Sequence, residues 1–243
     1  MNLIIDVGNT YTKLAVFRNN KLIAKERIET KNCSIEVKKL QKKFEEINQV
    51  IVSSVGKLDS KTLIYLKAKF QLQILSHTTN LPFKNLYSTP TTLGIDRIAL
   101  VCASVGEFLD NNVLIIDAGT CITYDFINSK NEYLGGAISP GVRMRYKAMH
   151  NQTANLPLLT TEVPKQIIGD STANSMHSGV VNGVLNEIDG TISQYKEKYQ
   201  DLTVILTGGD AKMLSKQLKS SIFANSNFLL EGLNFILQFN QHK

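Results

Sequence analysis

Asp6-Val7-Gly8-Asn9-Thr10 has a near copy later in the chain, Asp117-Ala118-Gly119-Thr120. Each stretch directly follows a short apolar run, Leu3-Ile4-Ile5 in the first case and Val113-Leu114-Ile115-Ile116 in the second. Such runs, when they end at a turn with glycine, are typical of buried strands. The repeat indicates that the two halves of the chain share one architecture.

Each half shows three meandering strands followed by alternating helices and strands. In the first half we expect strands at 3–5, 12–17, 21–28, 50–53 and 72–75 and helices at 35–47, 63–70 and 91–108. In the second half we expect strands at 113–116, 122–127, 133–138 and 202–206, a helix entered at 139–141 that ends near 151, and helices at 171–198, 211–218 and 230–239. The economical explanation is a duplicated ribonuclease H-like α/β fold with lobes of residues 1–110 and 111–243. Such a duplication places the two glycine turns face to face across a ligand cleft.

Composition excludes several classes of protein. The 243 residues are 43% hydrophobic and carry a net charge of +6. The apolar runs are shorter than the roughly 18 to 20 residues of a membrane helix, and residues 1–6 look like a buried strand rather than a signal sequence. The lysines between residues 38 and 69 alternate with acidic residues and have few aromatic neighbours, which favours a solvated face over a nucleic-acid surface. We therefore expect neither a membrane nor a nucleic acid as a partner.

The cysteines Cys33, Cys102 and Cys121 are far apart and lack the paired spacing of zinc sites. We interpret them as reduced thiols in the core, which is typical of a cytoplasmic protein.

The two glycine turns have the chemistry of a phosphate and cation site. Gly8 and Gly119 let the backbone approach a ligand closely and leave N–H groups to donate to phosphate oxygens. Asp6 and Asp117 end their strands, so their carboxylates are placed to hold a hard cation directly or through water. One such turn alone is usually an ordinary hairpin, but two copies at equivalent places favour a functional role.

A third glycine turn, Thr207-Gly208-Gly209-Asp210-Ala211, joins a buried strand to a helix. By itself it is as well explained by an ordinary strand-to-helix connection. Beside two phosphate turns, a contact with adenine or ribose is the preferred interpretation. The Gly-x-x-x-x-Gly-Lys-Ser/Thr and Gly-x-Gly-x-x-Gly motifs do not occur, which argues against P-loop and dinucleotide-binding folds.

The segment Gly94-Ile95-Asp96-Arg97 places an acid and a base at the start of an apolar helix. Asp96 either complements the helix dipole or accepts a proton from a substrate hydroxyl, with Arg97 as an anchor for polar groups of the substrate. Phosphoryl transfer depends mainly on positioning and charge stabilisation, so one carboxylate base and phosphate-binding donors suffice for direct in-line transfer.

These motifs resemble those of the type III pantothenate kinases, members of the superfamily of acetate and sugar kinases, heat-shock ATPases and actin. The resemblance rests on 6–10, on Gly94-Ile95-Asp96-Arg97, on 117–120, on Gly135-Gly136-Ala137-Ile138-Ser139-Pro140-Gly141, and on Ala148-Met149-His150 with Thr153-Ala154 and Leu156-Pro157. The matches run in order along nearly the whole chain. The resemblance implies an actin-like ATPase fold and ATP-dependent phosphorylation of pantothenate, the first step of coenzyme A biosynthesis.

The resemblance also implies roles for single residues. Asp96 would be the general base, Asp117 would bind potassium or ammonium, and Mg²⁺ would accompany ATP. The family works as a homodimer, so helices of the second lobe would dimerise, and His150 and Thr153 would act across the interface. The implied ATP contacts are Asp6, Val7, Gly8, Asn9, Thr10, Tyr11, Thr12, Lys13 and Thr120, and the implied pantothenate contacts are Tyr87, Gly94, Ile95, Asp96, Arg97 and Thr172.

This sequence departs from the family pattern at Asp170, where a basic or neutral residue is usual, which weakens the local field for anions near Thr172. Cys121 replaces a common alanine but is small enough to pack similarly. Two alternatives stay open: a kinase of another small alcohol or sugar on the same fold, and a non-catalytic nucleotide-binding regulator.

Overall fold

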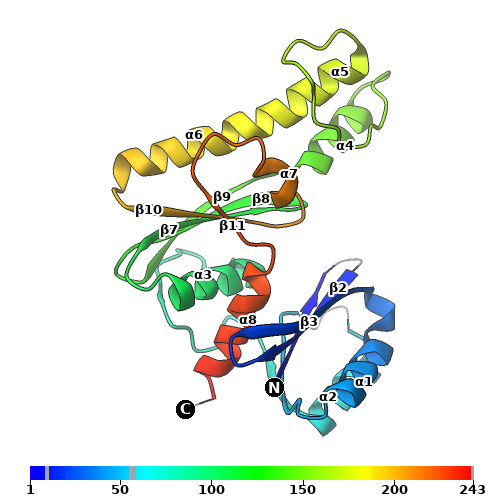
Figure 1. Cartoon of the computed structure of the whole chain (residues 1–243), viewed down its shortest axis with the longest axis vertical. Coiled ribbons are helices and arrows are strands. Elements are labelled where there is room, and N and C mark those ends of the chain that lie inside the picture. Colours follow the sequence, from blue (N-terminus) through cyan, green and yellow to red (C-terminus); the bar gives the residue numbers. More distant parts are fainter. Residues whose placement is uncertain (9–10, 55–57, 242–243) are drawn as a thin grey trace. The chain divides into compact units, whose positions relative to one another are not determined.

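The structure is a computed structural model that describes residues 1–8, 11–54 and 58–241 (Figure 1). By its internal contacts the chain forms two compact units. Unit 1 combines Met1–Glu107 with Asn227–Lys243, and unit 2 is Phe108–Ser226. The predicted boundary at residue 110 lies close to the end of the first segment. The predicted second lobe extended to residue 243, whereas the segment from Asn227 onward belongs to unit 1.

Unit 1 is built on a sheet with the strand order β3-β2-β1-β4-β5. β1, β2 and β3 form an antiparallel meander, and β4 and β5 continue the sheet parallel to β1. This confirms the strands expected in the first half. The strands are β1 (Asn2–Val7), β2 (Tyr11–Arg18), β3 (Lys21–Glu29), β4 (Gln49–Val52), β5 (Gln71–Ile74) and the short β6 (Lys84–Asn85); the helices are η1 (Thr30–Asn32), α1 (Cys33–Lys43), α2 (Ser60–Lys69), η2 (Pro90–Thr92), α3 (Ile95–Glu107) and α8 (Phe228–Phe239).

One face of this sheet packs on α1 and α2. Leu14 and Val16 of β2 lie in the same buried cluster as Val37 and Leu40 of α1 and Leu66 of α2. Burial of each such side chain contributes about 1.5 to 3 kcal/mol to folding. The alternation along β2 places the next residues, Lys13 and Ala15 among them, on the opposite face.

The C-terminal helix α8 completes unit 1 by packing closely on α3. A Cβ at Gly232 would lie 1.9 Å from the carbonyl oxygen of Ala99, so only a residue without a side chain permits this approach. At the other face of α8, Asn2 Nδ2 donates to Asn234 Oδ1 over 2.8 Å, which joins the helix to β1. These contacts explain why the chain returns to the first unit.

Unit 2 repeats the meander. Its strands lie in the order β11-β10-β7-β8-β9, with β7, β8 and β9 antiparallel and β10 parallel to β7. This confirms the strands expected in the second half, and β11 was not expected. The elements are β7 (Asn112–Ala118), β8 (Cys121–Ile127), β9 (Glu132–Pro140), α4 (Val142–Gln152), α5 (Thr172–His177), the π-helical η3 (Ser178–Asn182), α6 (Gly183–Lys198), β10 (Leu202–Thr207), α7 (Ala211–Leu214) and β11 (Phe223–Ala224).

The long helix α6 lies across the sheet of unit 2 (Figure 1). Val184, Ile188 and Ile192 of α6 share a buried cluster with Tyr124 and Phe126 of β8. The helix expected over 171–198 is confirmed, with π-helical geometry over Ser178–Asn182 in its middle.

Three expected helices are shorter than predicted. The helix expected from residue 91 begins at Ile95, because Pro90–Thr92 form a 3₁₀ turn and Leu93 is extended. The helix expected over 35–47 ends at Lys43, and the one expected over 211–218 ends at Leu214. The apolar spacing beyond these ends belongs to core residues in turns, which periodicity alone does not separate from helix.

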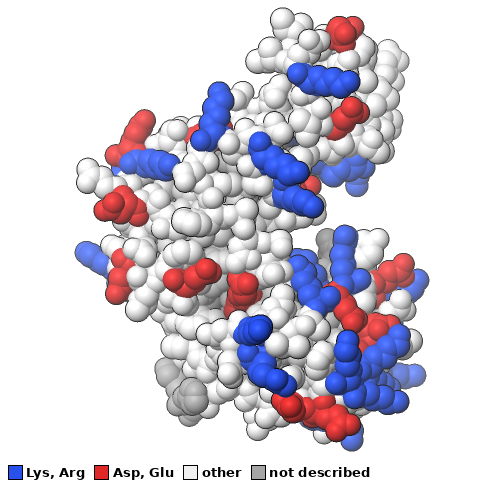
Figure 2. All heavy atoms as spheres, viewed as in Figure 1, with Lys and Arg blue, Asp and Glu red and all other residues white. Residues whose placement is uncertain are grey.

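Charged side chains of both signs cover the surface of unit 1 around α1 and α2 (Figure 2). The lysines there are interspersed with acidic residues, as the sequence indicated, and Lys39 Nζ lies 2.8 Å from Glu36 Oε1. Among the residues that the structure describes, no helix is long and apolar enough to cross a membrane.

Candidate active-site residues

The first glycine turn begins where β1 ends at Asp6 and Val7. Because β4 runs parallel to β1 in the neighbouring position, Ser53 just after β4 lies beside this turn. The Ser53 hydroxyl donates to Asp6 Oδ1 over 2.9 Å and accepts from the Val7 N–H over 3.1 Å. Lys13 Nζ lies 3.4 Å from Asp6 Oδ2. The Asp6 carboxylate is therefore held in one orientation beside an ammonium group.

Gly8 closes the turn, with its N–H donating to the carbonyl oxygen of Tyr11 over 3.0 Å. A Cβ at Gly8 would lie 2.6 Å from that oxygen, so the close approach requires glycine. The predicted ATP contacts Asn9 and Thr10 lie outside the described residues.

The predicted contacts on β2 alternate between the two faces of the sheet. Thr12 is fully buried, and its hydroxyl donates to Thr30 Oγ1 over 3.1 Å, so it already has a partner inside unit 1. Tyr11 is 44% exposed, and the Arg27 guanidinium lies over its ring, with Cζ 4.0 Å from the ring centroid. Lys13 and Tyr11 are thus the better placed of these residues for a ligand.

The structure brings together the predicted substrate residues of unit 1. Asp96 lies in the first turn of α3 with an exposed side chain, and its Oδ1 accepts from the Arg97 N–H over 2.8 Å. Arg97 is 5% exposed, and its Cζ lies 5.6 Å from the centroid of the Tyr87 ring. A Cβ at Gly94 would lie 2.5 Å from Asp96 Oδ1, so glycine there makes room for the carboxylate. Ile95 begins the helix between them.

The second glycine turn follows β7 in unit 2. The Gly119 N–H donates to the carbonyl oxygen of Cys121 over 2.9 Å, as the Gly8 N–H does in the first turn. Thr120 is exposed, and its carbonyl oxygen accepts from the Gly141 N–H over 3.1 Å, which joins the turn to the start of α4. A Cβ at Gly141 would lie 2.2 Å from the Gly119 carbonyl oxygen. Asp117 is half-buried at the end of β7.

The third glycine turn packs directly on the second. Gly208 has a φ of +97°, and a Cβ there would lie 2.3 Å from the Ala118 carbonyl oxygen and 2.4 Å from Asp117 Oδ1. The Asp210 N–H donates to the same Ala118 oxygen over 2.9 Å. Burial raises the pKa of Asp210, and the nearby Arg143 charge acts in the opposite direction. The two turns that the sequence singled out in this half therefore form one cluster.

The remaining predicted residues lie in the helices of unit 2. Thr172 is the exposed first residue of α5, and Asp170 before it accepts from Asn174 Nδ2 over 2.6 Å, which lowers the pKa of Asp170. His150 Nδ1 lies 2.7 Å from the Leu156 carbonyl oxygen, and the Thr153 hydroxyl donates to Met149. These side chains are exposed, and each contacts its own chain.

Two residues of the site were missed in the sequence. Ser53 ends a short strand that runs parallel to β1, and its position beside Asp6 is visible only once the strand order is known. Asp210 was predicted only as part of a turn, but the residue is half-buried and its backbone N–H donates to Ala118 of the Asp117 turn. Its place directly after Gly208-Gly209 was the available signal.

Cysteine, histidine and acidic side chains are the usual metal ligands in proteins. Cys33 and Cys102 are buried free thiols, as predicted, and burial raises the pKa of Cys33 to about 11; Cys121 is half-buried. Within residues 1–8, 11–54 and 58–241, no group of three or more His, Cys, Asp or Glu side chains gathers as a metal site.

Comparison with known proteins gives a consistent result. A family model described as type III pantothenate kinase matches residues 2–194. A type III pantothenate kinase from Christiangramia forsetii is 56% identical over 99% of this chain and 99% of its own length. A Campylobacter jejuni structure described as a Baf family transcriptional activator is 21% identical with a TM-score of 0.62, and covers 99% of this chain and 100% of that one. The structure of glucokinase from an Antarctic psychrotroph is 11% identical with a TM-score of 0.53, and covers 98% of this chain and 99% of that one. These two structures confirm the predicted fold class.

Proposed function

The chain belongs to the type III pantothenate kinase family, and we propose that it transfers the terminal phosphoryl group of ATP to the primary hydroxyl of pantothenate, the first step of coenzyme A biosynthesis. One observation of the structure supports this most. At the start of α3, the exposed Asp96 carboxylate lies on the same turn as the buried Arg97, beside Tyr87. This group supplies a base and an anchor for an anionic alcohol.

In the proposed reaction, Asp96 accepts the proton of the pantothenate hydroxyl while that oxygen forms a bond to the γ-phosphorus of ATP. The bond from the γ-phosphorus to the bridging oxygen breaks, and ADP leaves with the electron pair. The Arg97 N–H from the backbone fixes the orientation of the Asp96 carboxylate over 2.8 Å. The Arg97 guanidinium, stacked near Tyr87, binds the polar groups of the substrate.

We assign the nucleotide to the glycine turns. In unit 1, the Lys13 ammonium binds phosphate, together with Asn9 and Thr10, which follow Gly8 in the turn. In unit 2, Thr120 binds phosphate and the 207–211 turn contacts adenine or ribose. Mg²⁺ bound with ATP neutralises phosphate charge during transfer.

The Asp117 carboxylate is the proposed ligand of a monovalent cation, potassium or ammonium. Its Oδ1 and the Ala118 carbonyl oxygen both lie close to Gly208, because a Cβ there would be 2.4 Å from the first and 2.3 Å from the second. A set of oxygen donors with a single formal charge suits a hard monovalent ion. The residues present therefore fit such a cation.

We also propose that the protein works as a cytoplasmic homodimer. Exposed apolar side chains around the segment between α4 and α5, Leu158, Ile167 and Ile168, support an interface there, with Ile167 and Ile168 each 77% exposed. In this arrangement His150 and Thr153 act across the interface. Light scattering of the purified protein checks the mass, and a monomer at working concentration would rule the arrangement out.

An assay of ADP release with a panel of alcohols distinguishes the proposed function from its alternatives. We expect turnover with pantothenate and little with glucose, N-acetylmannosamine or glycerol, and phosphopantothenate as the product. Preference for a sugar would assign the chain to another kinase activity on the same fold. ATP binding without turnover of any alcohol would favour a nucleotide-binding regulator.

A further inference from the structure

Asp6, Lys13 and Arg27 form a row across three strands of unit 1. In the antiparallel register Asp6 of β1 lies opposite Lys13 of β2, and Lys13 lies opposite Arg27 of β3. Residues directly opposite each other on antiparallel strands present their side chains on the same face. This face is the one away from the α1 and α2 core, because Thr12 and Leu14, on the other face, are fully buried.

Arg27 is held in this row by Tyr11. Its guanidinium Cζ lies 4.0 Å from the centre of the Tyr11 ring, which is a cation–π contact. A guanidinium that rests on an aromatic ring keeps its N–H donors at its edge, where they form a fork that matches phosphate oxygens. Among the described residues, Arg27 makes no hydrogen bond or ion pair of its own. The exposed Arg27 guanidinium is therefore positioned by the Tyr11 ring, and no carboxylate among the described residues neutralises its charge.

The neighbouring charges increase the positive field of this face. Lys25 lies two residues before Arg27 on the same face of β3, and its Nζ donates to Asn227 Oδ1 over 2.7 Å. Burial lowers the pKa of Lys25, the Lys13 charge lowers it further, and Glu231 partly opposes them. Glu29, which lies opposite Tyr11, is paired with Lys31 over 2.6 Å. Crowded cations of this kind favour an anionic ligand.

We propose that Arg27, positioned by Tyr11 and next to Lys13, binds the phosphate chain of the nucleoside triphosphate. The proposal rests on the proposed function and adds a residue of β3 to the nucleotide site, which the sequence motifs placed on β1 and β2. Arg27 forms bidentate hydrogen bonds to non-bridging phosphate oxygens, and Lys13, whose ammonium the Asp6 carboxylate holds at 3.4 Å, contributes a point charge beside them. Lys25 adds to the field without direct contact, because its ammonium already donates to Asn227.

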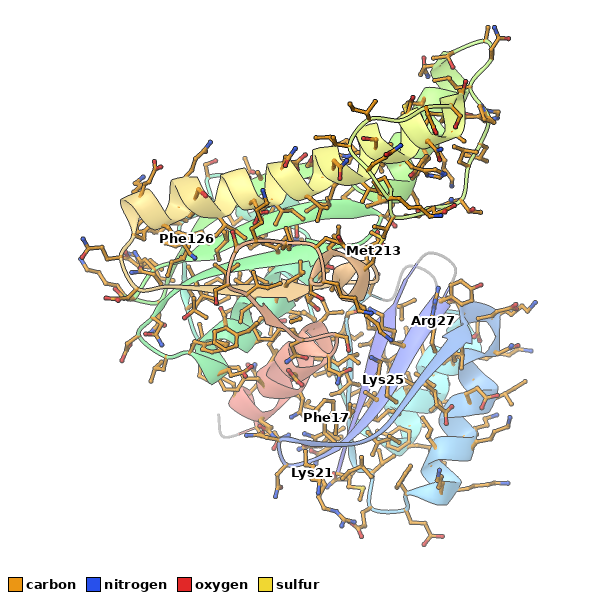
Figure 3. All side chains as sticks on the ribbon, turned by 45° about the horizontal axis from the view of Figure 1, so that its top comes forward. Phe17, Lys21, Lys25, Arg27, Phe126 and Met213 are labelled. Atoms are coloured by element: carbon orange, nitrogen blue, oxygen red, sulfur yellow. The ribbon has the colours of Figure 1, made fainter. Side chains whose placement is uncertain are left out.

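The test compares Arg27→Gln with Lys21→Gln, which makes the same change in charge at the far end of β3. Figure 3 shows Arg27, Lys25 and Lys21 in this order along the strand. Lys21 pairs with Arg18 beyond a register shift, so it lies on the other face. Calorimetry with ADP, ATP and inorganic tripolyphosphate is expected to show about tenfold weaker binding for Arg27→Gln, the effect of one charge-assisted contact. Lys21→Gln is expected to bind like the wild type.

Kinetics separate this role from a purely structural one. We expect Arg27→Gln to raise the KM for ATP about tenfold with the KM for pantothenate unchanged, and Arg27→Lys to recover part of the loss. Tyr11→Leu, which keeps the arginine but removes its platform, is expected to lie between Arg27→Gln and the wild type. Unchanged nucleotide binding in Arg27→Gln, or an equal loss in Lys21→Gln, would overturn the proposal.

The experiments also show whether the phosphate site or the proposed function fails, because each can fail without the other. If the wild type phosphorylates no pantothenate while Arg27→Gln still weakens ADP and tripolyphosphate binding, the proposed function fails and the phosphate site stands. If pantothenate is phosphorylated and Arg27→Gln leaves the KM for ATP unchanged, only the phosphate site fails. Where Arg27→Gln lowers the melting temperature, Arg27→Lys decides, because the charge is kept and the nucleotide affinity is expected to rise again.

Discussion

The Asp6 turn and the Asp117 turn have nearly the same sequence and are stabilised in different ways. Both follow the first strand of a meander, and in both the glycine N–H donates back to the second strand, from Gly8 to Tyr11 over 3.0 Å and from Gly119 to Cys121 over 2.9 Å. The backbone repeat is therefore real. What surrounds the two carboxylates is different.

The Asp6 turn is held by side chains. Ser53 donates to the Asp6 carboxylate and Lys13 forms an ion pair with it, and the turn needs its own glycine because a Cβ at Gly8 would lie 2.6 Å from a carbonyl oxygen. An ion pair that is this exposed contributes about 0 to 1 kcal/mol to stability, so its main effect is orientation.

The Asp117 turn is held by backbone packing. A Cβ at Gly119 would have no described atom closer than 3.8 Å. By contrast, a Cβ at Gly208 would lie 2.3 Å from the Ala118 carbonyl oxygen, and a Cβ at Gly141 would lie 2.2 Å from the Gly119 carbonyl oxygen. In this turn, glycine is therefore required at the neighbouring positions 208 and 141 rather than at Gly119 of the motif. The two copies of the motif keep the same backbone path in different surroundings: the side chains of Ser53 and Lys13 contact Asp6, whereas backbone of neighbouring glycine segments packs on the Asp117 turn.

The largest effect is expected at a residue that belongs to neither turn. Asp96→Asn removes the proposed base, so kcat is expected to fall by about 10² to 10⁴ while ATP affinity stays close to that of the wild type. Steady-state kinetics with calorimetry of ATP binding measures both. If the variant is as active as the wild type, Asp96 is not the general base.

Next in size is Gly208→Ala, which tests the backbone packing of the Asp117 turn. The positive φ and the 2.3 Å contact with Ala118 predict a loss of about 1 to 3 kcal/mol in stability, seen as a lower melting temperature, with weaker ATP binding. Gly209→Ala is the matched control, because a Cβ there would meet no described atom within 4 Å. Equal effects in both variants would contradict the packing described for this turn.

Asp117→Asn is expected to abolish the advantage of potassium or ammonium over sodium. The loss of the charge weakens cation binding by about tenfold, the effect of one charge-assisted contact. Activity measured in chloride salts of the three cations, at constant ionic strength, gives the result. A wild type indifferent to the cation, or a variant with the same preference, would show that the second turn binds none.

The smallest expected effect is the difference in stability between alanine variants of the two motif glycines. Gly8→Ala is expected to cost more than about 1 kcal/mol because of the 2.6 Å contact, and Gly119→Ala less than about 0.5 kcal/mol. Chemical unfolding of the two variants under the same conditions makes the comparison. If Gly119→Ala is the more damaging, the turns are not stabilised as described here.

Much of the fold was predictable because its signals are local. The two meanders, the long helix of unit 2 and the turns at Gly8 and Gly119 follow from apolar runs and glycine positions. Helix ends were less predictable, since Leu93 and Phe44 continue the apolar spacing after the helix geometry has changed. The return of 227–243 to unit 1 depends on the close contact of Gly232 with Ala99, which no local pattern reveals.

The grouping of candidate site residues was predictable where a motif is contiguous, as in Gly94-Ile95-Asp96-Arg97, whose members the structure places together with Tyr87. Their role stays a prediction. The grouping was not predictable where strand order brings distant residues together. Ser53 reaches Asp6 through the parallel pairing of β4 with β1, and Arg27 reaches Lys13 through the pairing of β3 with β2. To predict these pairs of residues, the strand order and register must be known in addition to the sequence.

We propose that this chain transfers a phosphoryl group directly from ATP to pantothenate. The most direct measurement is the reaction with ATP that carries a chiral, isotopically labelled γ-phosphoryl group, followed by determination of the configuration at phosphorus in the product. We expect labelled 4′-phosphopantothenate with inverted configuration, because a single in-line displacement inverts the phosphorus centre. Retained configuration, or ADP released without labelled phosphopantothenate, would contradict it.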